Sequence, residues 1–215
     1  MTECPDIIAE LVAHLSRGNR KLPRTTAILN LCSATDCPSR ARGLCRIAQD
    51  AESRRTQGLP ARDCYALKAE RAYPAVLPYR RRQDDITSRA TGDDIATAVL
   101  SLSSRSRYPV NALRVSEAGD FRGQDDVQRV EDAARALKRH GIAVYCYTAR
   151  ADLDYRDCVA LTVNGSGFRP NGGGGNTFAA VAVPSRASGP VCPGDCTSCR
   201  ICVRRHGKTV QVQLH

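Results

Sequence analysis

The chain has 215 residues, enough for one large domain or two small ones, and 42% of its residues are hydrophobic, as in ordinary globular proteins. Its 32 Lys and Arg residues outnumber its 22 Asp and Glu residues, which gives a net charge of +10. No stretch is long and apolar enough to cross a bilayer, so the sequence predicts no membrane partner.

The eleven cysteines are many for this length and odd in number. Residues 1–5 lack the basic and apolar regions of a secretory signal peptide. We therefore expect a reducing cytoplasm, where clustered cysteines are metal ligands more often than disulfides.

The first part of the chain predicts a short amphipathic helix over residues 6–16, followed by an irregular segment. Residues 19–62 are rich in Arg, Ser, Pro and Gly, apart from a possible helix over residues 44–54. A loop this long with little apolar periodicity needs something to order it, and bonds to a metal can replace missing hydrophobic burial.

Four cysteines in this region form a candidate metal site, which we call the N-terminal cysteine group: Cys32, Cys37, Cys45 and Cys64. A helix capped by Asp63 would place Cys64 in its first turn, where the helix dipole stabilises a thiolate. The spacing is loose, and partly buried free thiols are the alternative interpretation.

The positive charge is concentrated in residues 17–90, which hold sixteen Lys and Arg against seven Asp and Glu. Such a bias suits nucleic acid or another anion. A basic surface without a dedicated partner is the alternative, because the arginines are scattered except at residues 80–82.

The rest of the chain alternates predicted helices and strands. Pro74 and Pro78 are expected to interrupt it before a helical region within residues 84–103. Strands are predicted over residues 111–116, 142–148, 158–163, 178–183 and 209–214, and an amphipathic helix over residues 124–140. Strand, helix and strand at this spacing indicate parallel βαβ units.

The predicted fold class is therefore α/β. We expect a partial barrel or open sheet of parallel βαβ units, with an irregular Cys-rich N-terminal segment and a C-terminal Cys knuckle. A single domain over residues 1–215 would contain three parts: residues 1–110, helical and irregular; residues 111–185, the βαβ sheet; and residues 186–215, the knuckle and a last strand.

Polar side chains fall at the predicted C-terminal ends of the strands, where functional groups gather in such folds. They are Glu117, Asp120, Tyr147, Thr148 and Asn164. Glu117 and Asp120 could form an acid/base pair, and a capping Asp beside a solvated Glu is the alternative.

The last cysteines are the most informative feature of the sequence. Cys192, Cys196, Cys199 and Cys202 lie within eleven residues, separated by three, two and two residues. Thiolates so close repel one another unless a cation or cluster holds them, and neighbours at this spacing bridge poorly as disulfides. Zinc and an iron–sulfur cluster are both possible, with His206 as a substitute ligand.

The compact run favours a cluster over zinc, because zinc knuckles usually arrange two cysteine pairs a dozen or more residues apart. We therefore expect at least one [4Fe-4S] cluster on the C-terminal knuckle and a second one if the N-terminal cysteine group is also filled.

Several segments resemble a phage-associated family, the gene product 88 domain. They are the loop from Cys32 to Cys45, Cys64-Tyr65-Ala66 at a helix start, residues 114–121, residues 145–150 and the closing Cys-Pro knuckle. The resemblance covers about residues 28–205. It implies a phage or prophage origin and hence the cytoplasm of a host cell, and it brings no established activity.

A second likeness concerns chemistry. Cys192, Cys196 and Cys199 have the spacing seen in radical S-adenosylmethionine enzymes, where the fourth iron of the cluster is left open. The run is also similar to bacterial ferredoxin motifs with the spacing reversed. Here Cys202 could fill the open iron.

Three functions follow from these patterns. The first is a phage iron–sulfur protein with a redox or cluster-dependent role and an unknown redox or host partner. The second is a zinc-stapled module that binds nucleic acid or a host protein. The third is a radical S-adenosylmethionine-like enzyme, so the sequence leaves open whether the protein is an enzyme.

Overall fold

The computed structural model describes residues 6–57, 64–173, 175–181 and 183–213. Within these residues the centre of the molecule is a seven-stranded sheet in which every strand lies beside its neighbour in sequence. The first two strands are antiparallel and all other pairs are parallel. The strands are β1 (Ser16–Arg17), β2 (Thr26–Leu29), β3 (Ala112–Val115), β4 (Ala143–Thr148), β5 (Leu161–Ser166), β6 (Asn176–Val181) and β7 (Thr209–Gln213).

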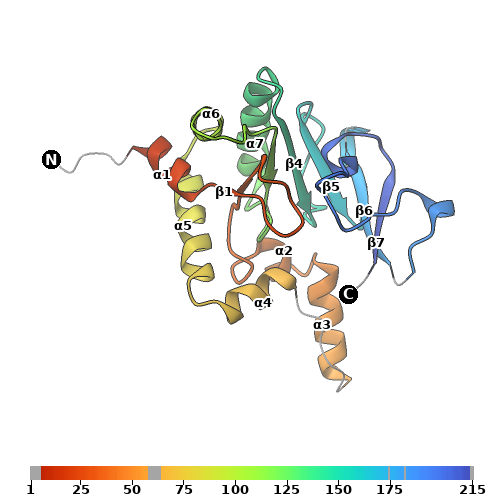
Figure 1. The fold of residues 1–215 in the computed structure, drawn as a ribbon. Coiled ribbons are helices and arrows are strands. Elements are labelled where there is room, and N and C mark those ends of the chain that lie inside the picture. The colour runs from red at the N-terminus through yellow and green to blue at the C-terminus, as the bar shows by residue number, and fades with distance from the viewer. Residues whose placement is uncertain (1–5, 58–63, 174, 182, 214–215) are drawn as a thin grey trace.

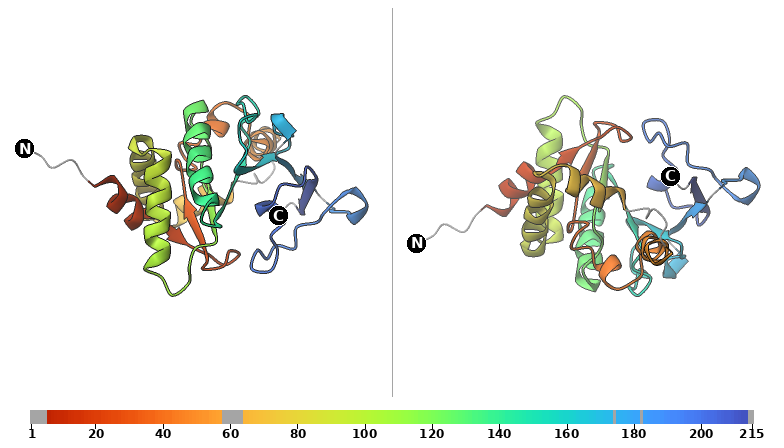
Figure 2. Two further views of the ribbon diagram at one scale, coloured as in Figure 1. Left: turned by 90° about the horizontal axis from the view of Figure 1, so that it is seen from above. Right: turned by 90° about the horizontal axis from the view of Figure 1, so that it is seen from below.

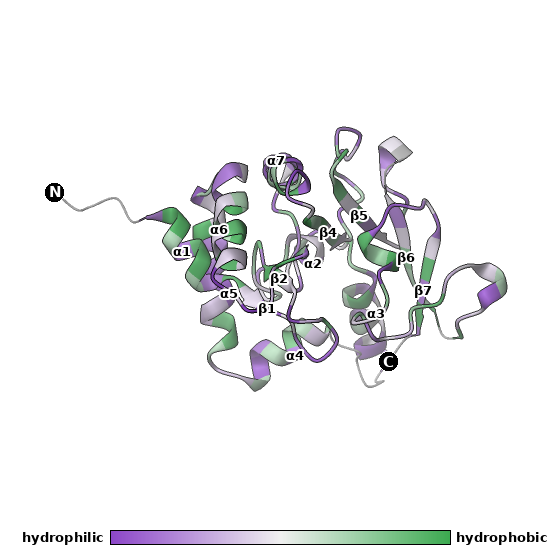
Figure 3. Cartoon of the chain, turned by 45° about the horizontal axis from the view of Figure 1, so that its top comes forward, coloured by the Kyte–Doolittle hydropathy of each residue, from purple (hydrophilic) through white to green (hydrophobic). Residues whose placement is uncertain are grey.

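This order confirms the predicted α/β class and the open sheet of parallel units. The helices are α1 (Ile7–His14), α2 (Pro38–Ala41), α3 (Arg46–Thr56), α4 (Tyr65–Ala72), α5 (Val76–Arg89), α6 (Gly92–Ser104) and α7 (Gln124–Lys138), with short 3₁₀ turns η1 (Asn171–Gly173), η2 (Arg186–Ser188) and η3 (Ile201–Val203). Figure 1 shows α1, α5 and α6 gathered at the β1 end of the sheet, while α3 projects from the body. Hydrophobic and hydrophilic residues alternate along α1 and α6, as expected of helices with one buried face (Figure 3).

The two faces of the sheet differ in character. Because successive strand residues point to opposite faces, one face carries the aliphatic side chains that pack with α7 in the main core, including Val115, Val144 and Leu161. The other face carries the intervening residues, including Arg114 and Tyr145. Figure 2 shows α7 on one side of the sheet and the segment after β6 on the other.

The strand β2 was not predicted. Residues 19–62 were expected to be irregular, yet β2 pairs with β3 and all four of its residues are buried. A strand buried on both faces has no alternation of apolar and polar residues, and four residues are too few to show a pattern. The helix expected over residues 44–54 is confirmed as α3.

Two other boundaries differ from the prediction for clear reasons. Pro78 does not interrupt the chain but lies in the first turn of α5, where no backbone N–H needs a helical partner. The strand expected from residue 158 begins at Leu161, because the carboxylate of Glu131 accepts the backbone N–H groups of Val159, Ala160 and Leu161.

Among the described residues, each helix is too short or too polar to span a bilayer.

Candidate functional site

The C-terminal cysteine knuckle (Cys192, Cys196, Cys199 and Cys202) lies on the sheet face opposite α7. Its backbone is fastened at three points. The N–H of Cys192 donates to the Gln211 carbonyl of β7 at 2.8 Å, and the N–H of Cys196 donates to the Lys21 carbonyl at 3.0 Å. The carbonyl of Cys202 accepts the Nδ2 of Asn164, in β5, at 2.9 Å. Three of the knuckle cysteines are thus held by separate parts of the fold.

Two buried asparagines hold the end of the knuckle. Asn164 also donates to the Cys146 carbonyl at 2.9 Å, and its Oδ1 accepts the Nδ2 of Asn176 at 3.0 Å. Asn176 donates in turn to the Arg204 carbonyl at 2.9 Å and accepts the His206 N–H at 2.9 Å. Asn164 was singled out from the sequence as a strand-end residue, whereas no sequence pattern distinguished Asn176.

The knuckle thiols are close enough to affect one another's ionisation. Burial raises the pKa of Cys202 to about 11, a hydrogen bond with the Tyr147 hydroxyl opposes this, and the charges of the other three knuckle cysteines raise it further. Burial also raises the pKa of Cys196, and the charges of Cys192 and Cys199 add to the effect. The four sulfur groups therefore share one region of the sheet face.

Within the described ranges, no group of three or more His, Cys, Asp or Glu side chains stands in an arrangement that could hold a metal ion. A tetrahedral zinc site would require four sulfurs each about 2.3 Å from one centre. As a donor set, four thiols suit an iron–sulfur cluster as well as zinc.

Arg114 is the charged residue beneath the knuckle. Its guanidinium carbon lies 5.1 Å from the centre of the Tyr147 ring, and its Nη2 is 3.4 Å from the Tyr65 hydroxyl. Its Nε is buried and has no hydrogen-bond partner among the residues that the structure describes. The positive charge lowers the pKa of Cys196, which places the cation near that thiol.

The arginine keeps its charge in this position. Burial would lower the pKa of Arg114, but the neighbouring Tyr65, Tyr147, Tyr145 and Glu117 outweigh burial and raise it. The centre of the Tyr147 ring also lies 4.9 Å from the centre of the Phe178 ring in an edge-on contact, so two aromatic side chains lie near the cation. Sequence analysis missed Arg114, because a single arginine in a short strand gives no signal of a partner.

The N-terminal cysteine group is arranged differently. Cys32 is buried, and its sulfur lies 3.3 Å from both the backbone nitrogen and the carbonyl oxygen of Asp120. Burial raises the pKa of Cys32, and the charge of Cys37 adds to this. Burial likewise raises the pKa of Cys37 to about 11, with further contributions from Asp120 and Cys45. The structure thus brings three of these cysteines together.

Cys64 is the exception in this group. It is the N-cap of α4 and not a first-turn residue, and Asp63, which was expected to cap the helix, lies outside the described residues. Cys64 packs against a small apolar cluster that contains Ala34 and Ala118. Its surroundings are those of a half-buried core thiol.

Protein groups order the loop that carries Cys32 and Cys37. The carboxylate of Glu70 accepts the N–H of Ala34 at 2.7 Å, and the N–H and hydroxyl of Thr35 at 2.8 Å. It also pairs with Arg80 at 2.9 Å, with both side chains buried. The sequence suggested a metal as the ordering element here, and the structure has a buried ion pair in that role.

The carboxylates Glu117 and Asp120 belong to separate networks. Asp120 is buried and accepts the Ser39 hydroxyl at 2.6 Å and the Ala149 N–H at 2.8 Å, and burial raises its pKa. Glu117 is half-buried and accepts the side-chain amide of Asn19. Through its hydrogen bonds the buried Asp120 links Ser39 of α2 to the end of β4.

With this geometry in view, the comparison with known families is informative. The family model described as gene product 88 matches residues 13–165, which is more than half of the chain. The chain belongs to the gene product 88 family. No curated protein matches it, and no solved structure does either.

The gene product 88 match confirms the resemblance seen in the sequence. The matched residues include β2 to β5, the N-terminal cysteine group, Arg114 and Asp120, and they end before the C-terminal knuckle. The knuckle is thus carried by a segment outside the matched region, although it packs on strands that the family shares.

The remaining predicted site residues of this gene product 88 protein have structural surroundings. The Thr148 hydroxyl accepts the Arg150 N–H at 3.0 Å. Cys146 and Cys158 are buried thiols. The Nδ1 of His206 accepts the Lys208 N–H at 3.0 Å, and its Nε2 is buried without a hydrogen-bond partner.

Proposed function

We propose that this gene product 88 protein is an iron–sulfur protein. In this proposal Cys192, Cys196, Cys199 and Cys202 ligate one [4Fe-4S] cluster. One observation carries the proposal: the four thiols share a sheet face with Arg114, a half-buried cation whose buried Nε has no hydrogen-bond partner among the described residues.

The charge of this site suits an anionic cluster. Four thiolates with bound iron and sulfide carry net negative charge, and a buried anion needs a nearby cation and hydrogen-bond donors. Arg114 supplies the cation. The Tyr147 hydroxyl, which hydrogen-bonds to Cys202, supplies a donor of the kind that tunes cluster potentials.

The arrangement of the thiols supports a cluster over a single zinc ion. The four knuckle thiols lie in one run of eleven residues, whereas zinc knuckles usually arrange two cysteine pairs a dozen or more residues apart. When bound, such a cluster supplies one-electron chemistry. The partner in that case would be an electron donor or acceptor of the host or phage.

The same reasoning argues against a second cluster on the N-terminal cysteine group. Asp120 lies beside Cys32 and Cys37; burial is the main cause that raises the pKa of both thiols and the Asp120 charge adds to it, although the Asp120 backbone lowers the pKa of Cys32. A buried carboxylate disfavours additional negative charge. We therefore assign one cluster to the protein and leave the N-terminal group as thiols.

The test is to purify the protein without oxygen and to measure iron, acid-labile sulfide and zinc per chain, together with the visible spectrum. We expect about four irons with matching sulfide and a broad band near ~400 nm. A colourless protein that contains zinc would contradict the proposal and favour the zinc-stapled module. About eight irons would contradict the assignment of a single cluster.

A further inference from the structure

A basic surface lies where β2 and β3 begin, and one of its loops also holds the knuckle through the bond from the Cys196 N–H to the Lys21 carbonyl. We call it the arginine–tyrosine surface and define it by Arg17, Arg24, Arg105, Arg107 and Tyr108. It is made by two loops, residues 18–25 between β1 and β2 and residues 105–111 between α6 and β3.

Hydrogen bonds join these two loops into one unit. The N–H of Asn111 donates to the Thr25 carbonyl at 2.9 Å. Arg17 donates through Nε to the Arg24 carbonyl at 3.1 Å, and its other nitrogens donate to the Ser106 hydroxyl and the Tyr108 carbonyl. One arginine therefore fastens both loops through neutral oxygens and keeps its positive charge uncompensated.

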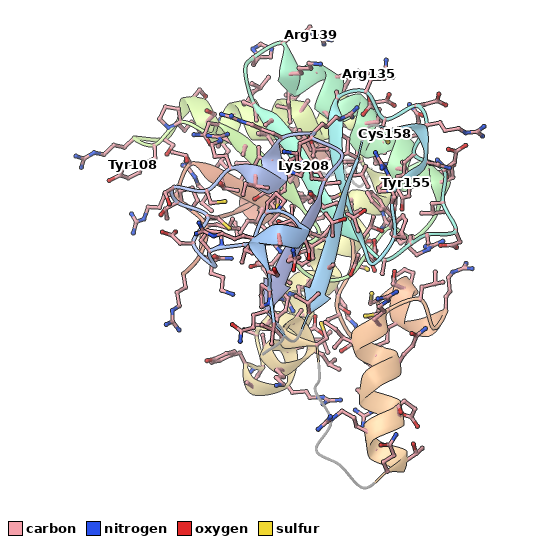
Figure 4. All side chains as sticks on the ribbon, turned by 90° about the vertical axis from the view of Figure 1, so that its right-hand side faces the viewer. Tyr108, Arg135, Arg139, Tyr155, Cys158 and Lys208 are labelled. Atoms are coloured by element: carbon pink, nitrogen blue, oxygen red, sulfur yellow. The ribbon has the colours of Figure 1, made fainter. Side chains whose placement is uncertain are left out.

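An aromatic ring stands in the middle of these cations. Tyr108 is 43% exposed, which is high for a large aromatic side chain. The guanidinium carbons of Arg24 and Arg107 lie 6.0 Å and 5.8 Å from the centre of its ring. Figure 4 shows Tyr108 at the outer margin of the molecule, where the ring can meet a ligand.

The charge of this surface is not neutralised. Residues 16–26 and 103–112 contain no Asp or Glu. In the part of the chain that the structure describes, Arg17, Arg24, Arg105 and Arg107 form no ion pair with a carboxylate.

Other arginines of this protein behave differently. The run at residues 80–82 was the most conspicuous basic feature of the sequence, yet each of its members is paired: Arg80 with Glu70, Arg81 with Asp36, and Arg82 with Glu10 and Asp85. Ion pairs also engage Arg89, Arg122, Arg129, Arg135, Arg150 and Arg156. The arginine–tyrosine surface is thus a place where cations are left available for an external anion.

We propose that the arginine–tyrosine surface binds single-stranded nucleic acid. Guanidinium groups bind phosphates, and an exposed aromatic ring stacks on bases, which only a single strand presents freely. The combination of both groups on joined loops distinguishes such a partner from a simple polyanion. This inference is independent of the proposed cluster, because none of its residues is a proposed ligand.

The test is fluorescence anisotropy of a labelled oligothymidylate, and of an RNA of equal length, with the full-length protein at low and moderate salt. Replacing Arg24→Glu and Arg107→Glu together should weaken binding by about 30-fold or more at low salt and flatten the plot of log affinity against log salt by about 1.4. Tyr108→Leu should weaken binding by about 10-fold, as expected for one lost base stack.

Two matched controls separate this surface from the overall charge. Lys68→Glu and Lys138→Glu together make the same change of charge at exposed positions of α4 and α7, and Tyr73→Leu removes another exposed tyrosine. Both controls should bind within about 2-fold of the natural protein, because the lost stack or phosphate contact is what changes affinity.

Three results would overturn the proposal. The first is no binding of either oligonucleotide at low salt. The second is equal weakening by the surface variants and their controls, which would indicate adsorption through net charge. The third is tighter binding to duplex DNA or to phosphatidylserine vesicles than to single strands, with the same residues involved. Circular dichroism of each variant confirms that loss of binding is not loss of folding.

Discussion

The two cysteine groups of this protein contain equal numbers of thiols but face opposite charges. The N-terminal group lies beside the buried carboxylate Asp120; burial raises the pKa of Cys32 and Cys37 most and the Asp120 charge adds to it, although the Asp120 backbone lowers the pKa of Cys32. The C-terminal knuckle lies beside Arg114, whose charge lowers the pKa of Cys196. The comparison teaches that the charge around a cysteine group, more than the number of its thiols, determines whether it suits an anionic cluster.

The groups also differ in how their backbones are ordered. Glu70 and Arg80 organise the loop of the N-terminal group, so that loop has its own source of order. In the knuckle, the cysteines themselves make the anchoring bonds to β7, β5 and the loop at Lys21. Cysteines whose own backbone groups are hydrogen-bonded to the rest of the fold are well positioned to hold a cofactor.

The largest effect is expected from removing single knuckle thiols. Cys196→Ala and Cys202→Ala should each abolish cluster binding, because both sulfurs are proposed ligands. The buried thiol Cys158 offers the control, and Cys158→Ala should retain the iron. The measurement is iron per chain after anaerobic purification. If Cys202→Ala kept the cluster while Cys196→Ala lost it, an open iron and the radical-enzyme reading would replace the present assignment.

The next effect concerns the packing of the N-terminal group. A Cβ added at Gly119 would lie 2.3 Å from the Cys32 sulfur and 2.4 Å from the Cys32 carbonyl oxygen, and its φ is +71°. Gly119→Ala should therefore lower the free energy of unfolding by about 3 kcal/mol, from overpacking and backbone strain together.

Gly43 provides a matched control for that substitution. Its φ is +69°, but an added Cβ would meet nothing within 4 Å. Gly43→Ala should cost about 1 kcal/mol from backbone strain alone. Urea denaturation of both variants measures the difference, and equal losses would mean that the contact between Gly119 and Cys32 contributes nothing.

A smaller loss is expected from Glu70→Gln, about 2 kcal/mol at neutral pH, because charged hydrogen bonds to the loop are weakened. Burial would raise the pKa of Glu70, but hydrogen bonds from Ala34, Arg80 and Thr35 outweigh it and lower the pKa from 4.5. The stabilisation is therefore complete above that pH and is lost as the pH falls through the lower folded-state value.

Denaturation of the two proteins across acidic pH checks this prediction. As the pH falls below the pKa of Glu70, the unfolding free energy of the natural protein should fall more steeply than that of Glu70→Gln. The two curves of unfolding free energy against pH should then converge in acid. Parallel curves would show that Glu70 does not carry the pH dependence and that something else orders the loop.

The smallest effect concerns the potential of the proposed cluster. Arg114→Gln removes a half-buried positive charge beside the knuckle, so reduction, which adds negative charge, becomes harder. We expect the midpoint potential to fall by roughly 50 mV, from a Coulomb interaction attenuated by the protein. Arg200→Gln is the control, because Arg200 lies in the knuckle but is exposed, and solvent screens its charge. The midpoint potentials are measured by spectroelectrochemistry. Equal shifts of the potential in both variants would mean that Arg114 does not tune the cluster.

The sequence predicted the parts of the fold that have long, regular patterns. The amphipathic helix α7, the strands β3 and β4, and the crowded cysteines of the knuckle were all visible in it. The strand β2 was not, because four fully buried residues show no alternation. Nor could the sequence show that Pro78 falls in the first turn of a helix.

The chemical surroundings of the cysteines were also beyond the sequence. Arg114 lies about eighty residues before the knuckle in the chain, and only the pairing of β3 to β7 into one sheet brings the two together. Asn176 and Glu70 likewise act across long separations in sequence. In contrast, Tyr147 and Asn164 could be singled out from local pattern as strand-end residues, although Asn164 lies within β5 and not after its end.

The central claim is that the C-terminal knuckle, and not the N-terminal group, holds the cluster. The direct test is to measure iron and acid-labile sulfide per chain in two double variants, Cys192→Ser with Cys196→Ser, and Cys37→Ser with Cys45→Ser, purified without oxygen. The account predicts that the first variant loses all iron and the second retains the content of the natural protein. Iron that survives in the first variant and disappears in the second would contradict it.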